Sequence, residues 1–386
     1  RLEGNVALRY DRKDFSDFNN KVIFDIKIDK ASVSSNDMKH YYGEFGRNQQ
    51  FNVRGKLLGT LNNFSTKKLK LIDDNNSEII GDFTFKNLFS KNKGDFYMKG
   101  DFSKVSSTYT NLIAILPKVL GNNLPTTFKK FGAFTLSGTT EVTLKTIKAD
   151  ILLKTALGNA KSNLSMTSID NIDNATYIGN IQLDNFNLGK LLNRTDVGVV
   201  NLDLEVDGKG FIQKYLNTKL EGKVNSIFYN NYNYTNVVVD GTMVKSIFSG
   251  EITVNDPNLQ MDFDGNLNLN NKENKYDFHA NVEYANLEKL KLYTADSISV
   301  FRGDVTMKLE GNTIDNLYGD VFINHTSYEN NKDTYFFVDF VVKSSFDENR
   351  VRTMTINSPD IIEGKVVGKF QFNQLQKLIE NSLGSL

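Results

Sequence analysis

The residues of this 386-residue chain that are best suited to chemistry are three histidines and numerous carboxylates. His40, His279 and His325 are far apart in the sequence, and the pattern around His279 places it on the polar face of a strand. A solvated histidine is the simpler interpretation there, with a metal ligand as the alternative. Asp262 and Asp264 share one strand face, which could pair two carboxylates but equally describes an ordinary solvated surface. Neither set predicts a catalytic or metal site.

Sequence motifs of known catalytic and cofactor sites are missing. The chain has no HExxH, P-loop or nucleophile-elbow pattern. It has no cysteine, which removes disulfides and thiolate metal sites. Basic and acidic residues number 46 each, so no basic surface suited to nucleic acid is indicated. We therefore expect a protein that is not an enzyme, holds no metal or cofactor, and binds no nucleic acid.

The elements that position these residues are segments of alternating polarity. The run YDFHANVEY (276–284) places Phe278 and Val282 on one side and Asp277 and Glu283 on the other. Similar alternation occurs at 22–28, 200–207, 261–269 and 305–309. Alternation of this kind is typical of strands with one apolar and one polar face. Clusters of Asn, Asp and Gly between the segments indicate short turns, which join antiparallel neighbours.

A weak long-period repeat runs through the sequence. LDNFNLGKLL (183–192) resembles EYANLEKLKL (283–292), and DPNLQMDFDGNLNL (256–269) resembles SPDIIEGKVVGKFQF (358–372). The pattern predicts one continuous segment over 1–386. Its approximate repeat units are 1–30 (partial), 31–101, 102–182, 183–281 and 282–386. Because the opening residues match the middle of a later unit, we expect the chain to be an internal piece of a longer repeat protein.

Helical patterns are few. Between Val105 and Pro117, helical spacing is kept by Tyr109, Leu112, Ile113 and Leu116. We interpret this stretch as a helix that covers an edge or seam of the sheet, with a gate over its apolar face as the alternative. A second stripe, Leu375 to Leu383, predicts a C-terminal helix. The runs FNLGKLL and ANLEKLKL each predict one helical turn.

Strands with a single apolar face must hide that face in a sandwich, a closed barrel or a curled trough. At about 15 residues for each strand and turn, the chain holds roughly 25 strands, which is too many for one flat open sheet. We find neither the linkers nor the buried Trp that characterise tandem sandwiches. The prediction is an all-β fold: a long, curled, mainly antiparallel repeat sheet that forms a U-shaped β-groove solenoid with an apolar interior and a few short helices.

An inner wall of Phe, Leu, Ile and Val suits acyl chains, because burial of a 16-carbon chain contributes on the order of 10 kcal/mol without any specific contact. An error of one residue in register would move a side chain to the other face. A structural solenoid with a dry core is the competing interpretation. The side chains predicted to line the groove are Val22, Phe24, Ile26, Phe83, Phe85, Leu202, Leu204, Phe263, Leu267, Leu269, Phe278, Val282, Val305, Met307, Leu309, Phe370 and Phe372.

Residues 301–385 resemble TamB proteins of Bacteroidota, which belong to the AsmA-like superfamily, and NSPDIIEGKVVGKFQFNQL (357–375) is the most specific part. The resemblance implies a U-shaped, apolar β-groove in the periplasm of a Gram-negative bacterium. It implies passage of phospholipid from the inner to the outer membrane, or else assistance in the assembly of outer-membrane proteins. It also implies two partners: a TamA-like outer-membrane barrel or its lipoprotein variant, and the inner membrane, reached through an upstream anchor that is not in this chain.

Overall fold

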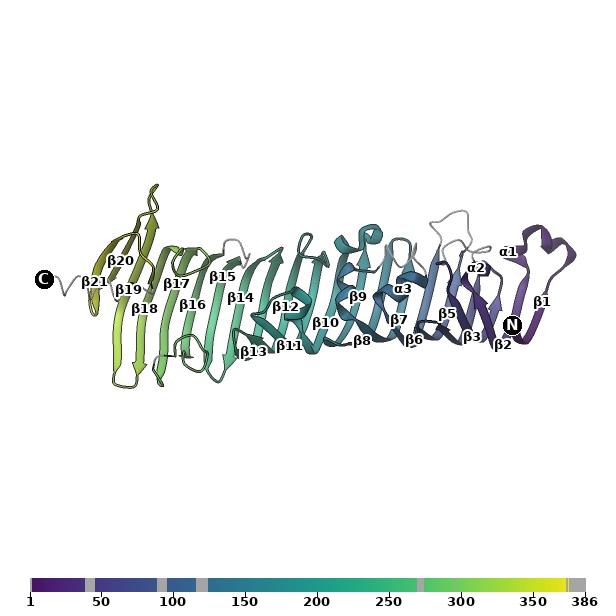
Figure 1. Cartoon of the computed structure of the whole chain (residues 1–386), viewed down its shortest axis with the longest axis horizontal. Helices are drawn as coiled ribbons and strands as arrows, with labels where there is room; N and C mark the ends of the chain where they lie inside the picture. Colours follow the sequence, from purple (N-terminus) through teal and green to yellow (C-terminus); the bar gives the residue numbers. More distant parts are fainter. Residues whose placement is uncertain are drawn as a thin grey trace. The chain divides into compact units, whose positions relative to one another are not determined.

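The computed structural model describes residues 2–38, 46–88, 96–115, 124–268, 274–294, 296–372 and 374. Within these ranges the chain is all-β, with 21 strands in one antiparallel sheet and a few short helices (Figure 1). The sheet does not close, because its two end strands do not pair with each other among the described residues. Strand β1 (Leu2–Arg9) pairs with β2 (Ile23–Ser34), and β21 (Ile362–Gly368) pairs with β20 (Arg352–Ser358). The predicted curled, mainly antiparallel all-β sheet is therefore confirmed.

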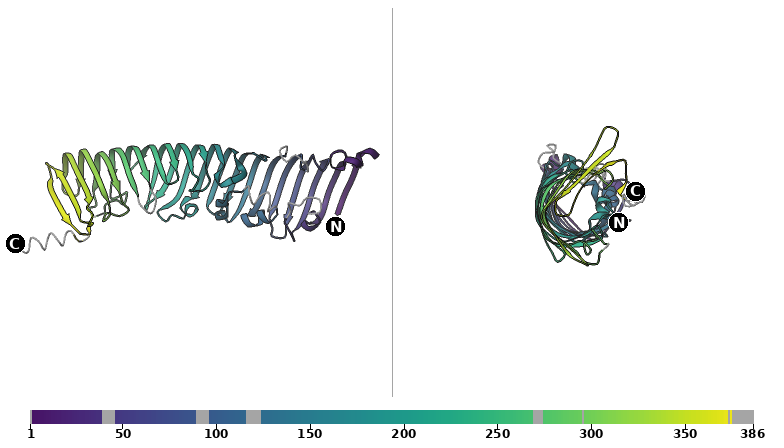
Figure 2. Two further views of the ribbon diagram at one scale, coloured as in Figure 1. Left: turned by 90° about the horizontal axis from the view of Figure 1, so that it is seen from above. Right: turned by 90° about the vertical axis from the view of Figure 1, so that its left-hand side faces the viewer.

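The chain divides into two compact units, Arg1–Thr218 and Lys219–Leu386, which we call the N-terminal and C-terminal units. Strand β12 (Asn217–Tyr229) crosses the boundary. Within each unit the strands bend to one side (Figure 2). The repeat boundaries expected from the sequence stay a prediction.

Strands of the N-terminal unit pair with their sequence neighbours in antiparallel order. After β1 they are β2 (Ile23–Ser34), β3 (Gln50–Gly59), β4 (Phe64–Asp73), β5 (Glu78–Lys86), β6 (Tyr97–Thr108), β7 (Ala133–Thr143), β8 (Thr146–Thr155), β9 (Gly158–Thr167), β10 (Thr176–Asn187) and β11 (Val197–Lys209).

The C-terminal unit follows the same scheme from β13 to β21. Its strands before β21 are β13 (Tyr232–Val244), β14 (Ile247–Asp256), β15 (Leu259–Asn268), β16 (Lys275–Asn286), β17 (Ser299–Glu310), β18 (Tyr318–Asn330), β19 (Thr334–Phe346) and β20 (Arg352–Ser358).

Bulges interrupt the pairing at intervals. The register shifts between Ile28 and Ala31 in β2, and between Phe102 and Val105 in β6. A similar shift occurs between Val282 and Ala285 in β16. An inserted residue increases the local twist and bends the strand, so bulges repeated on successive strands produce curl.

Short helices of the N-terminal unit lie on the open side of its curl (Figures 1 and 2). Helix α3 (Tyr109–Ile115) directly follows β6. The predicted start of this helix at Val105 is wrong, because Val105 belongs to β6 and faces Leu136 of β7. Tyr109 is buried, and Leu112 and Ile113 are half-buried. Leu116 and the predicted C-terminal helix lie outside the described residues.

The remaining helical segments of this unit are one or two turns long. They are η1 (Arg12–Asp17), α1 (Phe18–Lys21), α2 (Ser35–Met38), η3 (Thr126–Phe131), η4 (Ile169–Asn174) and α5 (Leu188–Leu192). Helix α5 confirms the turn predicted from FNLGKLL. The counterpart at 287–292 forms a turn in which the Leu290 amide donates to the Asn286 carbonyl at 3.0 Å. No helix within the described residues has the length and apolar character needed to span a membrane.

Candidate functional site

The strongest candidate site in the N-terminal unit is the apolar face of its sheet. One row of direct cross-strand partners crosses all eleven strands, β1 to β11, and every member is apolar. The row consists of Leu2, Ala31, Val53, Leu71, Ile79, Val105, Leu136, Leu153, Ala160, Leu183 and Leu202. Because side chains alternate along a strand, residues two positions away share this face, and they include the apolar Phe134, Ile181 and Leu204 as well as the polar Asp73 and Ser162.

A corresponding row crosses the C-terminal unit from β13 to β19. It consists of Val239, Ile252, Phe263, Ala280, Val305, Ile323 and Phe340. A second row, two residues along each strand, contains glycines at Gly241, Gly250 and Gly265, followed by Phe278, Met307 and Val321. Gly241 leaves room for the ring of Phe248, and Gly265 lies close to the Cα and Cβ atoms of Phe278.

Most side chains of these faces are only half-buried. Ile252, Leu267, Val305 and Met307 are all of this kind, although each has apolar neighbours on the adjacent strands. In a sandwich a second sheet would interdigitate with such a face and bury it. No second sheet faces these positions among the described residues. The face is therefore accessible from its open side, except where the buried Leu290 of the 287–292 turn packs in one cluster with Ala280, Val282 and Val305.

The opposite face carries polar pairs. Glu78 of β5 accepts hydrogen bonds from Lys104 at 2.6 Å and Lys70 at 2.8 Å, and these bonds lower its pKa. In the C-terminal unit, Asp304 accepts from the Asn281 amide at 2.7 Å. Pairs of this kind stabilise an exposed surface by small amounts. The two faces of the sheet therefore differ sharply in chemistry.

The residues predicted to line the groove fall mostly on the apolar faces. In the N-terminal unit these are Phe24, Ile26, Phe83, Phe85, Leu202 and Leu204. In the C-terminal unit they are Phe263, Leu267, Phe278, Val282, Val305, Met307 and Leu309. Contact of these side chains with lipid stays a prediction.

Three of the predicted lining residues are placed otherwise, and a fourth is not described. Val22 is the C-cap of α1, fully buried, and precedes β2. The predicted place of Phe370 and Phe372 on the inner wall of the sheet is wrong, because β21 ends at Gly368. The chain leaves the sheet there, and both rings pack against the Arg352 guanidinium, with centroids 5.9 and 4.7 Å away. Leu269 lies outside the described residues.

The residues considered for chemistry lie apart from the apolar faces. His279 is exposed, and its Nδ1 lies 3.2 Å from the Thr306 hydroxyl. His325 Nδ1 lies 3.3 Å from Asp304. Asp262 and Asp264 are exposed on the polar face of β15, and His40 lies outside the described residues. Within the described part of the chain, no group of three His, Cys, Asp or Glu side chains is arranged to hold a metal ion.

Two buried polar groups were missed by sequence reasoning. Asp256, at the end of β14, is buried and accepts from the Tyr232 hydroxyl at 2.5 Å and from the Thr235 hydroxyl at 2.7 Å. Burial alone would raise the pKa of Asp256, but these bonds and those from the Thr235 and Asn258 amides outweigh it and lower the pKa. The carboxylate thus fixes the turn at 256–259 against β13.

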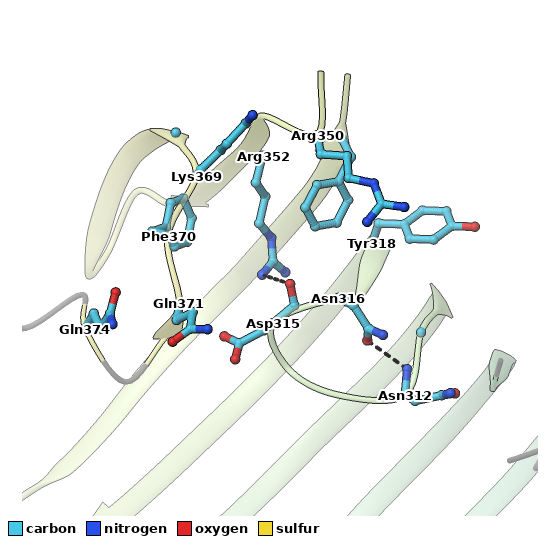
Figure 3. A pocket seen from close by; sticks show the side chains of 13 residues that line it. Asn312, Asp315, Asn316, Tyr318, Arg350, Arg352, Lys369, Phe370, Gln371 and Gln374 are labelled. Carbon is cyan, nitrogen blue, oxygen red and sulfur yellow. Dashed lines mark hydrogen bonds between the residues drawn. The ribbon is translucent and has the colours of Figure 1, made fainter. Parts of the chain in front are cut away.

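The second missed group is Arg352, the first residue of β20, which is buried on the apolar face. It lines a cavity of about 940 Å³ together with residues of the 311–318 segment and of the chain after β21 (Figure 3). The alternation of Arg352 with Met354 and Ile356 in RTMTINS was a readable signal that this arginine shares the apolar face.

The fold and this face define an all-β protein with an open sheet whose one side is apolar and accessible. Comparison of the chain with models of protein families, with curated proteins and with solved structures finds no match.

Proposed function

We propose that the chain carries phospholipid along the apolar faces of its sheet, as part of a bridge that moves phospholipid from the inner to the outer membrane and supports outer-membrane biogenesis. The observation that supports this proposal most is the half-burial of the apolar rows. A large, continuous, accessible apolar surface marks a binding site on a soluble protein. Acyl chains match the chemistry of this surface, because the side chains of the apolar rows are aliphatic and aromatic.

The energetics favour movement as well as binding. Each buried methylene contributes about 0.8 kcal/mol, so the sum over an acyl chain is large although no single contact is. Successive strands present similar side chains in the row from Leu2 to Leu202, so neighbouring positions have similar energies. A lipid can then shift by one strand spacing, about 4.8 Å, without crossing a region that lacks apolar contacts.

The resemblance of residues 301–385 to TamB proteins supports the cellular setting of the proposal. We place the chain in the periplasm of a Gram-negative bacterium. Its proposed partners are phospholipid, a TamA-like outer-membrane barrel or the lipoprotein variant of that barrel, and the inner membrane through an upstream anchor.

Adjacent valines of β13 provide a matched test. Val239 belongs to the apolar row, whereas Val238 points to the opposite face and is 45% exposed. The chain and its Val238→Glu and Val239→Glu variants are purified without detergent, and the bound phospholipid is extracted and quantified. Wild type and Val238→Glu are expected to carry equal amounts of phospholipid, and Val239→Glu to carry less, because a carboxylate on the apolar face opposes acyl chains there. Equal phospholipid in the two variants, or none in the wild type, would contradict the proposal.

A second candidate function is that of a chaperone or scaffold for outer-membrane strands, and one observation favours it. Residues 334–340 of β19 extend beyond the part that pairs with β20, which covers 341–346. Phe336, in this extension, is 75% exposed. A strand edge with exposed apolar side chains can accept an additional strand. Peptide crosslinks from position 336, without lipid crosslinks from the apolar rows, would favour this candidate.

A further inference from the structure

Arg352 occupies a position that the sheet otherwise gives to apolar residues. Its cross-strand partners are Phe346 of β19 and Gly368 of β21, and it shares its face with Met354. Only 4% of the residue is exposed. An arginine at such a position costs desolvation energy that must be offset by other interactions.

Neutral groups provide most of that compensation. The Arg352 Nε donates to the Ser344 hydroxyl at 2.8 Å, and Nη2 donates to the Leu317 carbonyl at 2.6 Å. Nη1 donates to the carbonyls of Ile314 at 3.0 Å and Asp315 at 3.4 Å. One Nη2 hydrogen has no acceptor among the described residues. The guanidinium also lies 4.7 Å from the centre of the Phe372 ring, which is a cation–π contact.

Arg352 forms no ion pair within the described part of the chain. The Asp315 carboxylate accepts a hydrogen bond from the Phe372 amide at 2.8 Å and acts on the Arg352 guanidinium through its charge, whereas the Asp315 carbonyl accepts the Nη1 bond given above. Burial lowers the pKa of Arg352, and Asp315 opposes that effect. Because arginine stays protonated in proteins, a positive charge remains here without an ion-pair partner among the described residues.

The cavity beside Arg352 has the size and the polar lining of a ligand site. Its volume is about 940 Å³, within the range of small-molecule pockets. Its charged lining residues are Arg350, Arg352, Lys369 and Asp315, so positive charge exceeds negative. Figure 3 shows the Arg350 side chain beside Tyr318 and the amides of Asn316 and Gln371 around the same space. The side-chain amides of Asn316 and Gln371 are neutral hydrogen-bond donors in the same cavity as the guanidinium groups of Arg350 and Arg352.

We infer that this cavity binds a phosphate ester, with Arg352 and Arg350 as its cationic ligands. Guanidinium groups match phosphate oxygens in geometry and form charge-assisted hydrogen bonds that are stronger than bonds to carbonyls. The phosphate supplies the negative partner that Arg352 does not find among the described residues. The inference rests on the proposed function in one respect: the phosphate is that of a lipid headgroup, whose acyl chains lie on the adjoining apolar face. A free phosphate would present the same chemistry.

Three soluble probes separate these sources: dihexanoyl phosphatidic acid, dihexanoylglycerol and inorganic phosphate. Their binding to the whole chain is measured by calorimetry, below the concentrations at which the lipids form micelles. Phosphatidic acid is expected to bind at least about tenfold more tightly than dihexanoylglycerol, which corresponds to one charge-assisted hydrogen bond. Inorganic phosphate is expected to bind weakly and to compete with phosphatidic acid.

Three variants test the ligands. Arg350→Gln removes an exposed cation that the sheet does not need, and it is expected to weaken phosphatidic acid binding several-fold and leave dihexanoylglycerol binding unchanged. Lys365→Gln, an exposed cation on β21 outside the cavity, is the charge-matched control and should bind as the wild type does. Arg352→Gln should abolish the preference for phosphate, and circular dichroism checks that it folds.

The results distinguish the phosphate site from the lipid-carrier proposal. Equal binding of phosphatidic acid and dihexanoylglycerol, or unchanged phosphatidic acid binding in Arg350→Gln, overturns the phosphate site and leaves the lipid-carrier proposal standing. Binding of inorganic phosphate without binding of either lipid supports the phosphate site and overturns the carrier proposal. If no probe binds, both proposals are wrong.

Discussion

The rings of Phe263 in β15 and Phe278 in β16 lie 5.0 Å apart between centroids at an interplanar angle of 41°. They are diagonal neighbours on one face, since Phe263 faces Ala280 and Phe278 faces Gly265. Phe263 is 6% exposed, whereas Phe278 is only half-buried. Diagonal aromatic pairs stabilise adjacent strands without a facing layer. The sheet can thus hold its curl and keep an accessible apolar side.

The close approach of Phe248 to Gly241 predicts a stability effect. A Cβ at Gly241 would lie 2.6 Å from Cε2 of Phe248 and 2.8 Å from the Ser249 carbonyl oxygen. Gly241→Ala is therefore expected to destabilise the C-terminal unit by about 1–3 kcal/mol through overpacking. The measurement is the urea midpoint of unfolding, followed by circular dichroism.

Gly364 in β21 is the control for this variant. A Cβ at Gly364 would meet nothing within 4 Å, so Gly364→Ala should leave the midpoint nearly unchanged. Phe248→Leu should recover part of the loss when combined with Gly241→Ala. If Gly241→Ala unfolds at the same urea midpoint as wild type, the Phe248 ring does not exclude a side chain at position 241.

The Asp256 carboxylate makes stability depend on pH. Its pKa is lower in the folded protein than the value of about 3.9 in an unfolded chain. Its stabilising contribution is therefore present above about pH 4 and is lost as the pH falls through the folded-state pKa. Asp256→Asn is expected to lower the unfolding free energy by about 1.5–3 kcal/mol at pH 7, because the hydrogen bonds from Tyr232 and Thr235 lose their charged acceptor. The difference in unfolding free energy between this variant and wild type should become smaller at lower pH.

Asp264→Asn, on the exposed face of β15, is the matched control and should follow the wild type across the same pH range. Unfolding free energies from urea titrations between pH 3 and pH 7 give the comparison. A constant difference between Asp256→Asn and wild type over this range would show that the carboxylate is not the titrating group.

Phe131 joins the helical segments of the N-terminal unit to its sheet. The residue is buried, and its ring lies 6.3 Å from that of Phe186 in β10. Lys129 of the same segment covers the Tyr109 ring of α3 at 5.5 Å. Phe131→Ala is expected to lower the unfolding free energy by about 3–5 kcal/mol.

The neighbouring Phe128 is half-buried and serves as the control. Phe128→Ala should cost distinctly less in the same urea titration. Equal losses for the two variants would show that contact with Phe186 does not anchor the segment.

The alternation of residues such as Phe278, Val282, Val305 and Met307 was sufficient to predict the strands, their antiparallel pairing and their apolar face. That pattern is strong because its period of two repeats over many residues. It could not fix where a strand ends. Val105 keeps helical spacing with Tyr109, yet pairing with Leu136 places it in β6.

The prediction at the C-terminal end of the described chain failed for a different reason. Phe370 and Phe372 alternate as strand residues do, but their rings pack on Arg352. That contact depends on the 312–317 segment, whose carbonyls hold the guanidinium. Tertiary contacts of this kind leave no periodic trace in the sequence, so the cavity could not be predicted from it.

A photocrosslinking amino acid placed at Leu267 or at Asn266 tests the central claim most directly. Leu267 is on the apolar face of β15 and faces Tyr276, and Asn266 is exposed on the opposite face. After irradiation in phospholipid-containing cells, the purified protein is analysed for crosslinked lipid by mass spectrometry. Phospholipid attached at position 267 and absent at position 266 is the predicted result, and no lipid at 267, or equal labelling at both positions, would contradict it.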